Sequence, residues 1–358
     1  MTSSRERVCN AIERKPNDRV PYNFRAEPSV YDKIKLEMSL PCDEAVREWA
    51  MSDIRDAGAI FNAGGYGGYS GFGWRDRDLG GGVQEDFWGV RRERVRNAGG
   101  EFIEICHFPM KEMSFDGIRS FEWPDPHRIY DFTALPGMLR KANGKNQYWW
   151  MIEGESMYDR SWAVRGMEQF LMDLVAEPEI ADFILGKMAG FFFEYTRMIL
   201  EKTDGMIDAI GIYNDLGTQN AMFISPAIYR ERIKPHQKRY IEMVKSYGVK
   251  VFHHSCGAME PVIPDLIEIG VDIIDPLQMK AMRTTPEEMK RKYGASVTLH
   301  GGLDTQGFLQ NANPAEVCDE VRHLIDVLGD DGGYILSGSH LYQSDVPVAN
   351  IKTIHEAM

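Results

Sequence analysis

The 358-residue sequence has few cysteines and lacks any long hydrophobic run, and each absence excludes a class of protein. Its five cysteines are odd in number and scattered, so they do not form a disulfide framework. No apolar stretch approaches the ~18 residues that a membrane-spanning helix needs. Residues 1–14 are charged and lack the apolar core of a secretion signal, so we expect a soluble, cytoplasmic protein with no membrane contact.

An excess of basic residues is also missing, because 41 Lys and Arg stand against 54 Asp and Glu, for a net charge of −13. This balance argues against a nucleic-acid-binding surface, which needs clustered positive charge. The glycine-rich run at 65–73 lacks the spacing and the strand-to-helix setting of a nucleotide-binding loop. A Gly-x-Ser-x-Gly nucleophile elbow is absent as well. A hydrophobic content of 43% is nevertheless sufficient for a large folded core.

The second half of the chain alternates short β-branched runs with helical patterns, which indicates a parallel sheet. One predicted helix, 226–247, begins after Ser225 with a proline and ends before Gly248, and another, 314–328, begins after Asn313. The predicted strands of this half are 148–152, 209–213, 249–253, 271–274, 296–299 and 333–336.

Two upstream segments, 20–24 and 58–63, complete a set of eight predicted strands. Eight parallel strands can close into a (β/α)₈ TIM barrel, so we expect residues 1–358 to form one barrel domain. The alternative is an open sheet with a second domain, which would leave two exposed sheet edges. Residues 64–146 interrupt the alternation and predict an insertion after the second strand. It is first glycine-rich and then forms a hairpin, with arms 87–94 and 101–108 and a turn at 97–100.

An insertion at this position lies over the catalytic face of a barrel. It is therefore interpreted as a lid or a partner-docking element. The alternative is an insertion with a purely structural role.

Polar residues gather where the predicted strands end, although unpaired charge is costly at a half-buried barrel mouth. This clustering predicts an active site at the carboxyl ends of the strands. The residues are Arg25, Glu153, Glu155, Asn214, Asp215, His253, His254, Cys256, Asp275, Gln278, His300, Asp304, Ser337, Ser339 and His340.

His254 and Cys256 form a His-x-Cys pair at the end of one predicted strand. Side chains alternate along a strand, so both should point to the same face, and His253 to the opposite face. Imidazole and thiolate are both good zinc ligands, and we expect His340 to supply a third, with Glu153 or Asp304 as substitutes. The alternative is that Cys256 is an ordinary thiol and that His254 hydrogen-bonds to substrate.

The order of these segments resembles the uroporphyrinogen decarboxylase superfamily, and in particular its corrinoid-linked methyltransferase branch. The likeness covers essentially the whole chain and implies the barrel. The segments that carry it are RERVCNAIERKPNDRVP, SDIRDAG, WAVRGMEQFLMDLVAEPE, the block from NDLGTQNAMFISPAIYRERIKPHQ through VFHHSCGAMEPVIPDLIEIGVDIIDPLQ, and HGGLDTQ.

Two departures from the family pattern bear on function. Porphyrinogen decarboxylases carry a pair of arginines near the N-terminus, whereas PYNFRAEPSVY offers Arg25 alone, so a porphyrinogen would lack its clamp. The methyltransferase branch holds zinc with His-x-Cys and a late cysteine. His254 and Cys256 match the first two, and His340 occupies the place of the third. With one thiolate fewer, zinc would be a stronger Lewis acid, suited to an ether or phenolate oxygen.

The resemblance therefore implies methyl transfer between a small methylated substrate and a corrinoid (cobalamin) cofactor, carried by a separate corrinoid protein. O-Demethylation of a methoxylated compound is the favoured form. Zinc on His254, Cys256 and His340 would bind the leaving oxygen, while Glu153, Asp215 or Asp304 donates a proton or a fourth ligand. The expected substrate-binding residues are Arg25, Asp53, Asn214 and Gln278.

Two other functions stay open at this stage. The first is a metal-independent decarboxylase of a small carboxylated or porphyrinogen-like substrate, in which Arg25 holds a carboxylate and Asp53 or Asp215 stabilises a protonated intermediate. The second is a non-catalytic homologue that binds substrate or corrinoid without transferring a methyl group.

Overall fold

A parallel seven-stranded sheet forms the centre of the computed structural model, which describes residues 2–58, 77–97, 100–143 and 147–358. The strands follow one another around the sheet in chain order, each parallel to the next. They are β1 (Ile54–Asp56), β6 (Trp149–Glu155), β7 (Ala209–Tyr213), β8 (Lys250–His254), β9 (Ile273–Leu277), β10 (Thr298–Leu303) and β11 (Tyr334–Gly338).

An eighth extended segment, residues 21–26, joins the two edges of this sheet. Tyr22 forms a parallel bridge with Leu336 in β11, and its carbonyl accepts a hydrogen bond from the Asp53 N–H just before β1. The sheet is thereby closed into a (β/α)₈-like barrel, as predicted. The segment forms isolated bridges instead of a continuous strand because Pro21 has no N–H and the Phe24 N–H donates to the Ser52 hydroxyl.

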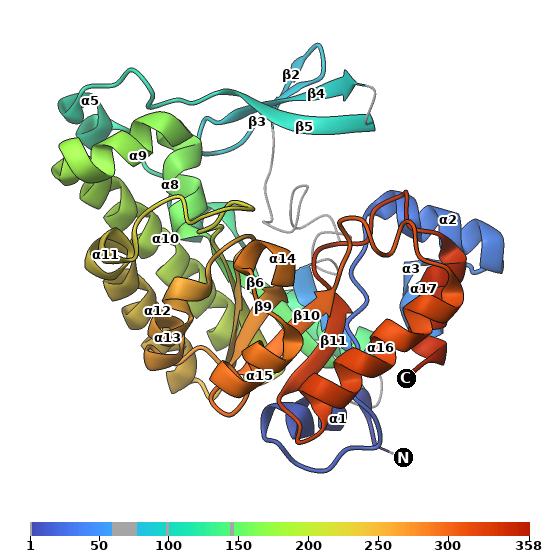
Figure 1. The fold of residues 1–358 in the computed structure, drawn as a ribbon. Coiled ribbons are helices and arrows are strands. Elements are labelled where there is room, and N and C mark those ends of the chain that lie inside the picture. Colours follow the sequence, from blue (N-terminus) through green and yellow to red (C-terminus); the bar gives the residue numbers. More distant parts are fainter. Residues whose placement is uncertain (1, 59–76, 98–99, 144–146) are drawn as a thin grey trace.

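The helices surround the barrel, with the long α10 packed on β6 (Figure 1). None of the described helices combines the length and apolarity needed to cross a membrane. Those before α10 are α1 (Ser4–Ile12), α2 (Pro28–Met38), α3 (Asp43–Trp49), α5 (Phe115–Ser120), α6 (Pro126–Ile129), α7 (Leu135–Asn143), α8 (Met157–Arg165) and α9 (Met167–Ala176). The others are α10 (Pro178–Thr203), α11 (Pro226–Ile228), α12 (Lys234–Ser246), α13 (Ile263–Glu268), α14 (Met279–Met282), α15 (Pro286–Tyr293), α16 (Pro314–Gly329) and α17 (Val348–Glu356).

Helix α1 closes the amino-terminal end of the barrel. Its Val8 and Ile12 pack against side chains that point into the barrel, among them Trp149 of β6 and Phe252 of β8. The neighbouring residue Val251 instead belongs to the larger core between strands and helices. The end occupied by α1 is thus filled with apolar side chains, which leaves the opposite end of the barrel for polar ones.

The two predicted helices are confirmed, with one difference. The predicted helix 314–328 is α16 (Pro314–Gly329), which begins with a capping box between Asn313 and Glu316. Residues 226–246 form one helical run in which a π-helical turn (Tyr229–Ile233) separates α11 from α12, and the Ser225 hydroxyl caps its start.

The predicted second strand, 58–63, was misplaced. Strand β1 covers Ile54–Asp56, residues 57 and 58 are helical, and residues 59–63 lie outside the described part of the chain. This strand was not recognised in the sequence because two of its three residues, Arg55 and Asp56, are charged. Arg55 is nevertheless buried, because its guanidinium is paired with Glu44 and with backbone carbonyls.

A separate antiparallel sheet forms much of the insertion. Its strands are β2 (Arg77–Gly80), β3 (Val83–Glu85), β4 (Arg91–Asn97) and β5 (Gly100–His107), paired in that order. The predicted hairpin is therefore confirmed as β4–β5. Its first arm begins at Arg91 and not at residue 87, because the preceding residues form a turn. In this turn the Asp86 carboxylate accepts hydrogen bonds from the N–H groups of Trp88 and Val90. Figure 1 shows this sheet on the side of the barrel opposite α1. Residues 64–76 of the insertion lie outside the described part.

Candidate functional site

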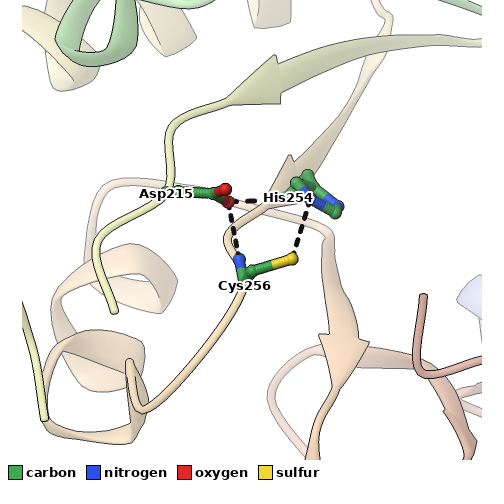
Figure 2. A group of neighbouring side chains, drawn as sticks. All are labelled: Asp215, His254 and Cys256. Atoms are coloured by element: carbon green, nitrogen blue, oxygen red, sulfur yellow. Dashed lines mark hydrogen bonds and ion pairs between the residues drawn. The ribbon is translucent and has the colours of Figure 1, made fainter. Parts of the chain in front are cut away.

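Three side chains that could bind a metal ion meet where β7 and β8 end (Figure 2). His254 Nε2 lies 3.5 Å from Cys256 Sγ and 3.7 Å from Asp215 Oδ1. The Cys256 N–H donates to the same Asp215 oxygen at 2.8 Å. All three donor atoms lie within 4.8 Å of one another, so we call this group the His-Cys-Asp cluster. The predicted alternation holds, since His253 faces outward and lies 3.3 Å from the amide of Gln237 on α12.

The loop after β8 is held from several sides, which fixes the position of Cys256. Gly257 has a φ of +84°, and a Cβ there would overlap the backbone of Gly217. The Gln278 side chain accepts from the Gly257 N–H at 2.7 Å and donates to the Ser339 carbonyl at 3.0 Å. Its amide nitrogen also lies 3.7 Å from Cys256 Sγ. Gln278, predicted to bind substrate, is therefore a support for the thiol.

Asp275 connects the charged groups behind the His-Cys-Asp cluster. Its fully buried carboxylate lies 2.5 Å from His254 Nδ1, 2.5 Å from His300 Nδ1 and 2.7 Å from the Arg25 guanidinium. The Asn23 amide nitrogen lies 3.0 Å from His300 Nε2 and can only donate, so His300 carries its proton on Nδ1. Asp275 thus accepts three hydrogen bonds.

This arrangement sets the electrostatics of His254. Burial disfavours the imidazolium, but the Asp275 carboxylate outweighs burial and raises the pKa of His254 to about 10. Burial works against the Asp275 anion as well, yet Arg25, His300 and His254 hold its pKa well below the usual range. His254 therefore donates from Nδ1 to Asp275 and directs Nε2 toward Cys256 and Asp215.

A cavity of about 380 Å³ opens beside the His-Cys-Asp cluster, and we call it the barrel pocket. The Tyr213 ring forms part of its wall and stacks on the His254 ring, with centroids 5.1 Å apart. The residues that line it are Asn23, Phe24, Arg25, Ala26, Pro28, Tyr31, Asp43, Arg47, Ile54, Asp56, Met151, Glu153, Tyr213 and Leu341.

Glu153 brings a buried acid to the barrel pocket. Its Oε1 has no hydrogen-bond partner among the described residues. Burial raises the pKa of Glu153 well above its usual range, although the positive charge of Arg160 opposes this effect. Burial therefore favours the protonated form of Glu153, from which the carboxyl group could donate a proton.

Three of the predicted site residues direct their side chains away from this group. Asp53 is fully buried near the start of β1, where it pairs with Arg7 and Arg19. Asn214 is also buried and bonds to Glu155 and to the Tyr158 N–H. Asp304 pairs with Lys280 and lines a different cavity, of about 280 Å³. Each of these side chains is bonded to the protein itself, away from the barrel pocket.

His340 lies near the His-Cys-Asp cluster but is not one of its three members. Its ring is half-buried after β11, and burial lowers its pKa, helped by the positive charges of His254 and Arg25. Asp215, which the sequence predicted as a proton donor or a fourth ligand, is the third residue whose ligand atom lies within 4.8 Å of the other two.

The sequence placed Asp275 and His300 in the predicted active site without assigning them a role, and it did not identify Asn23, Tyr213 or Arg47. The signal for the first two was present, because an aspartate and a histidine each interrupt an apolar strand. Arg47 could not be found in this way, because it belongs to α3 and reaches the barrel pocket only through the tertiary fold.

The spacing of the His-Cys-Asp cluster fits zinc. A tetrahedral zinc with bonds of about 2.0 Å to nitrogen and about 2.3 Å to sulfur separates these atoms by roughly 3.5 Å. The Nε2 to Sγ distance is 3.5 Å. The hydrogen bond from His254 Nδ1 to Asp275 is the support that zinc-binding histidines usually have.

Comparison with known proteins places the fold and the family. Two curated uroporphyrinogen decarboxylases, from two strains of Thermus thermophilus, are 27% identical to this chain over 133 residues, or 37% of either length. A solved methyltransferase from Methanosarcina mazei superposes with a TM-score of 0.69 at 12% identity, covering 100% of this chain and 98% of that one. This likeness establishes the barrel fold.

The uroporphyrinogen decarboxylase (URO-D) family model matches residues 151–358, which is more than half of the chain. The matched part contains the His-Cys-Asp cluster, Glu153 and Asp275. The chain therefore belongs to the uroporphyrinogen decarboxylase (URO-D) family.

Proposed function

We propose that this protein is a methyltransferase that moves a methyl group from a small methylated substrate to a corrinoid cofactor on a separate protein. The observation that carries the proposal is the His-Cys-Asp cluster, which lies behind Tyr213, a residue that lines the barrel pocket and stacks on His254. The Methanosarcina protein of the same fold is itself described as a methyltransferase, which agrees with this activity.

Asp215, His254 and Cys256 would hold a zinc ion, and His340 is the candidate for a fourth ligand. The ion would supply Lewis acidity toward a substrate oxygen. Since a carboxylate and an imidazole accompany a single thiolate, this donor set suits an ether oxygen better than activation of a thiol. We therefore retain O-demethylation of a methoxylated compound as the favoured reaction.

The residues of the chain have separate tasks in this reaction. Asp275 orients His254, and Arg25 in turn holds Asp275. When the methyl–oxygen bond breaks, its electron pair stays on the oxygen, and Glu153 donates the proton that neutralises it. A reduced corrinoid would supply the nucleophile that accepts the methyl group.

The size of the barrel pocket favours a small substrate over a porphyrinogen. Its volume of about 380 Å³ lies near the lower limit for ligand pockets. Of the two arginines that line the pocket, Arg25 alone comes from the segment in which porphyrinogen decarboxylases carry a pair.

The proposal is tested by methyl transfer from a panel of methoxylated compounds to cob(I)alamin, with and without added zinc. We expect transfer by the zinc-loaded protein, at least 100-fold less by Cys256→Ala (about the effect of losing one catalytic group), and full activity of Cys318→Ala on α16. Release of CO₂ without zinc or corrinoid would contradict the proposal and support the metal-independent decarboxylase. Corrinoid binding without any transfer would support the non-catalytic homologue.

A further inference from the structure

Arg47 presents an incompletely compensated positive charge to the barrel pocket. It belongs to α3, and its guanidinium lies 5.1 Å from the centroid of the Tyr31 ring. In the part of the chain that the structure describes, Glu44 is the one carboxylate in ion-pair contact with it, at 3.5 Å. Glu44 makes a closer contact with the buried Arg55, at 2.8 Å. Arg47 also hydrogen-bonds to the Tyr31 side chain, which leaves part of the hydrogen-bonding capacity of its guanidinium available to a ligand.

Two of the acidic residues that line the same pocket, Asp43 and Asp56, are already engaged, and burial favours the neutral form of the third, Glu153. Asp43 is paired with Lys35 at 2.7 Å, and Asp56 accepts a hydrogen bond from the Gly58 N–H at 2.8 Å. Asp275, behind the wall, accepts from Arg25 and two histidines. Since these carboxylates have partners and Arg47 is undercompensated, the pocket is suited to an anion more than to a cation.

The remaining walls are aromatic and apolar. Phe24 and Tyr31 meet edge to face, with centroids 5.4 Å apart, and Tyr31 lies beneath Arg47. Tyr213 forms the wall next to His254. A flat ring can pack against these faces, and Ile54 and Met151 close the floor without adding polar groups.

We infer that the substrate of the barrel pocket is an aromatic carboxylate, with its carboxylate on Arg47 and its ring against Phe24 and Tyr31. The methylated oxygen would then point to the Tyr213 wall and the His-Cys-Asp cluster. The planar guanidinium suits this role because it can bind both oxygens of a carboxylate. The placement of the methylated oxygen rests on the proposed function, whereas the carboxylate site stands on the pocket alone.

Calorimetric binding of 4-methoxybenzoate and of neutral methoxybenzene to the full-length protein tests this inference. We expect the acid to bind more tightly than methoxybenzene. Arg47→Met should weaken binding of the acid by about 10- to 100-fold, the usual effect of losing hydrogen bonds to a charged group, and leave methoxybenzene unaffected. The affinity of Arg47→Lys for the acid should lie between those of the natural protein and of Arg47→Met, because lysine keeps the positive charge but lacks the planar guanidinium that binds both carboxylate oxygens. Arg128→Met is the control, since that side chain is 82% exposed on α6.

Equal binding of the two compounds to the natural protein would overturn the inference. An equal loss of affinity for the two compounds in Arg47→Met would also overturn it, because that result indicates a general change in the pocket. If Arg47→Met does not fold, Arg47→Lys decides alone, and unchanged binding of the acid there overturns the inference.

The measurement is made on chelator-treated protein without corrinoid, so it is independent of methyl transfer. Arg47-dependent binding of the acid without any transfer would support the carboxylate site and contradict the proposed function. Methyl transfer from methoxybenzene at a rate that Arg47→Met leaves unchanged would support the proposed function and contradict the carboxylate site.

Discussion

Asp275 is the residue through which the charged groups of the site act on one another. It holds the His254 ring through Nδ1, and therefore leaves Nε2 facing Cys256 and Asp215. The two neighbouring histidines show how much this contact matters. Burial lowers the pKa of His253 to about 3, whereas His254, beside the Asp275 carboxylate, has its pKa raised to about 10.

Replacing Asp275 by asparagine should therefore weaken metal binding. An amide cannot accept from all three donors with the strength of a carboxylate, so His254 loses its fixed orientation. We expect zinc affinity to fall by about 10- to 100-fold, as for other residues that support a metal ligand. Competition titration with a chromophoric chelator measures this directly. Asp319→Asn, at an exposed position of α16, serves as the control, and equal affinities of the two variants would contradict the role of Asp275.

At the scale of elements, the site depends on how the loops after β7 and β8 approach each other. Gly257 and Gly217 lie so close that a Cβ on either would overlap the backbone of the other loop. This contact places Cys256 beside Asp215, on the loop that follows the neighbouring strand. The close approach of Gly257 and Gly217 is therefore needed to form the His-Cys-Asp cluster, although neither glycine contributes a side chain to it.

Gly257→Ala should accordingly lose both stability and metal binding. A non-glycine residue at positive φ costs about 1–2 kcal/mol, to which the overlap with Gly217 adds. Gly186→Ala on α10 is a matched control, because nothing lies near its Cβ position, and it should stabilise the protein by about 0.5–1 kcal/mol. Urea unfolding and zinc binding measure both variants. A Gly257→Ala protein as stable as Gly186→Ala would show that the two loops are free to separate.

The sequence was most informative where a strand is apolar and its end is polar. The predicted strand 209–213 coincides with β7, and the alternation in His253-His254-x-Cys256 correctly assigned the two faces. It failed at β1, where Arg55 and Asp56 replace apolar residues. It also placed Asp53 among the substrate-binding residues, because a carboxylate bonded to Arg7 and Arg19 cannot be distinguished by sequence from one in a site.

At the scale of the whole molecule, the barrel buries acidic groups at a cost that depends on pH. Glu155 at the end of β6 is 2% exposed, and burial raises its pKa from 4.5 to about 7. Its protonated form is thus favoured in the folded state. The associated stability is fully present below pH 4.5 and is lost as the pH rises through 7.

Glu155→Gln should remove this dependence, since glutamine resembles the protonated acid. Between pH 4.5 and pH values above 7, we expect the free energy of unfolding of the natural protein to fall relative to the variant by on the order of 3 kcal/mol, at 1.36 kcal/mol per pKa unit. Urea unfolding across this range gives the difference. Parallel curves for the two proteins would mean that Glu155 is ionised in the fold.

The measurement that tests the central claim most directly is the zinc content of the purified protein. Elemental analysis should find about one zinc per chain, the stoichiometry of a single site with four ligand positions. Cys256→Ala and Asp215→Asn should both lose it, while Cys318→Ala should retain it. A protein that takes up no zinc, or an Asp215→Asn variant that keeps a full equivalent while His340→Ala loses it, would contradict the metal site described by Asp215, His254 and Cys256.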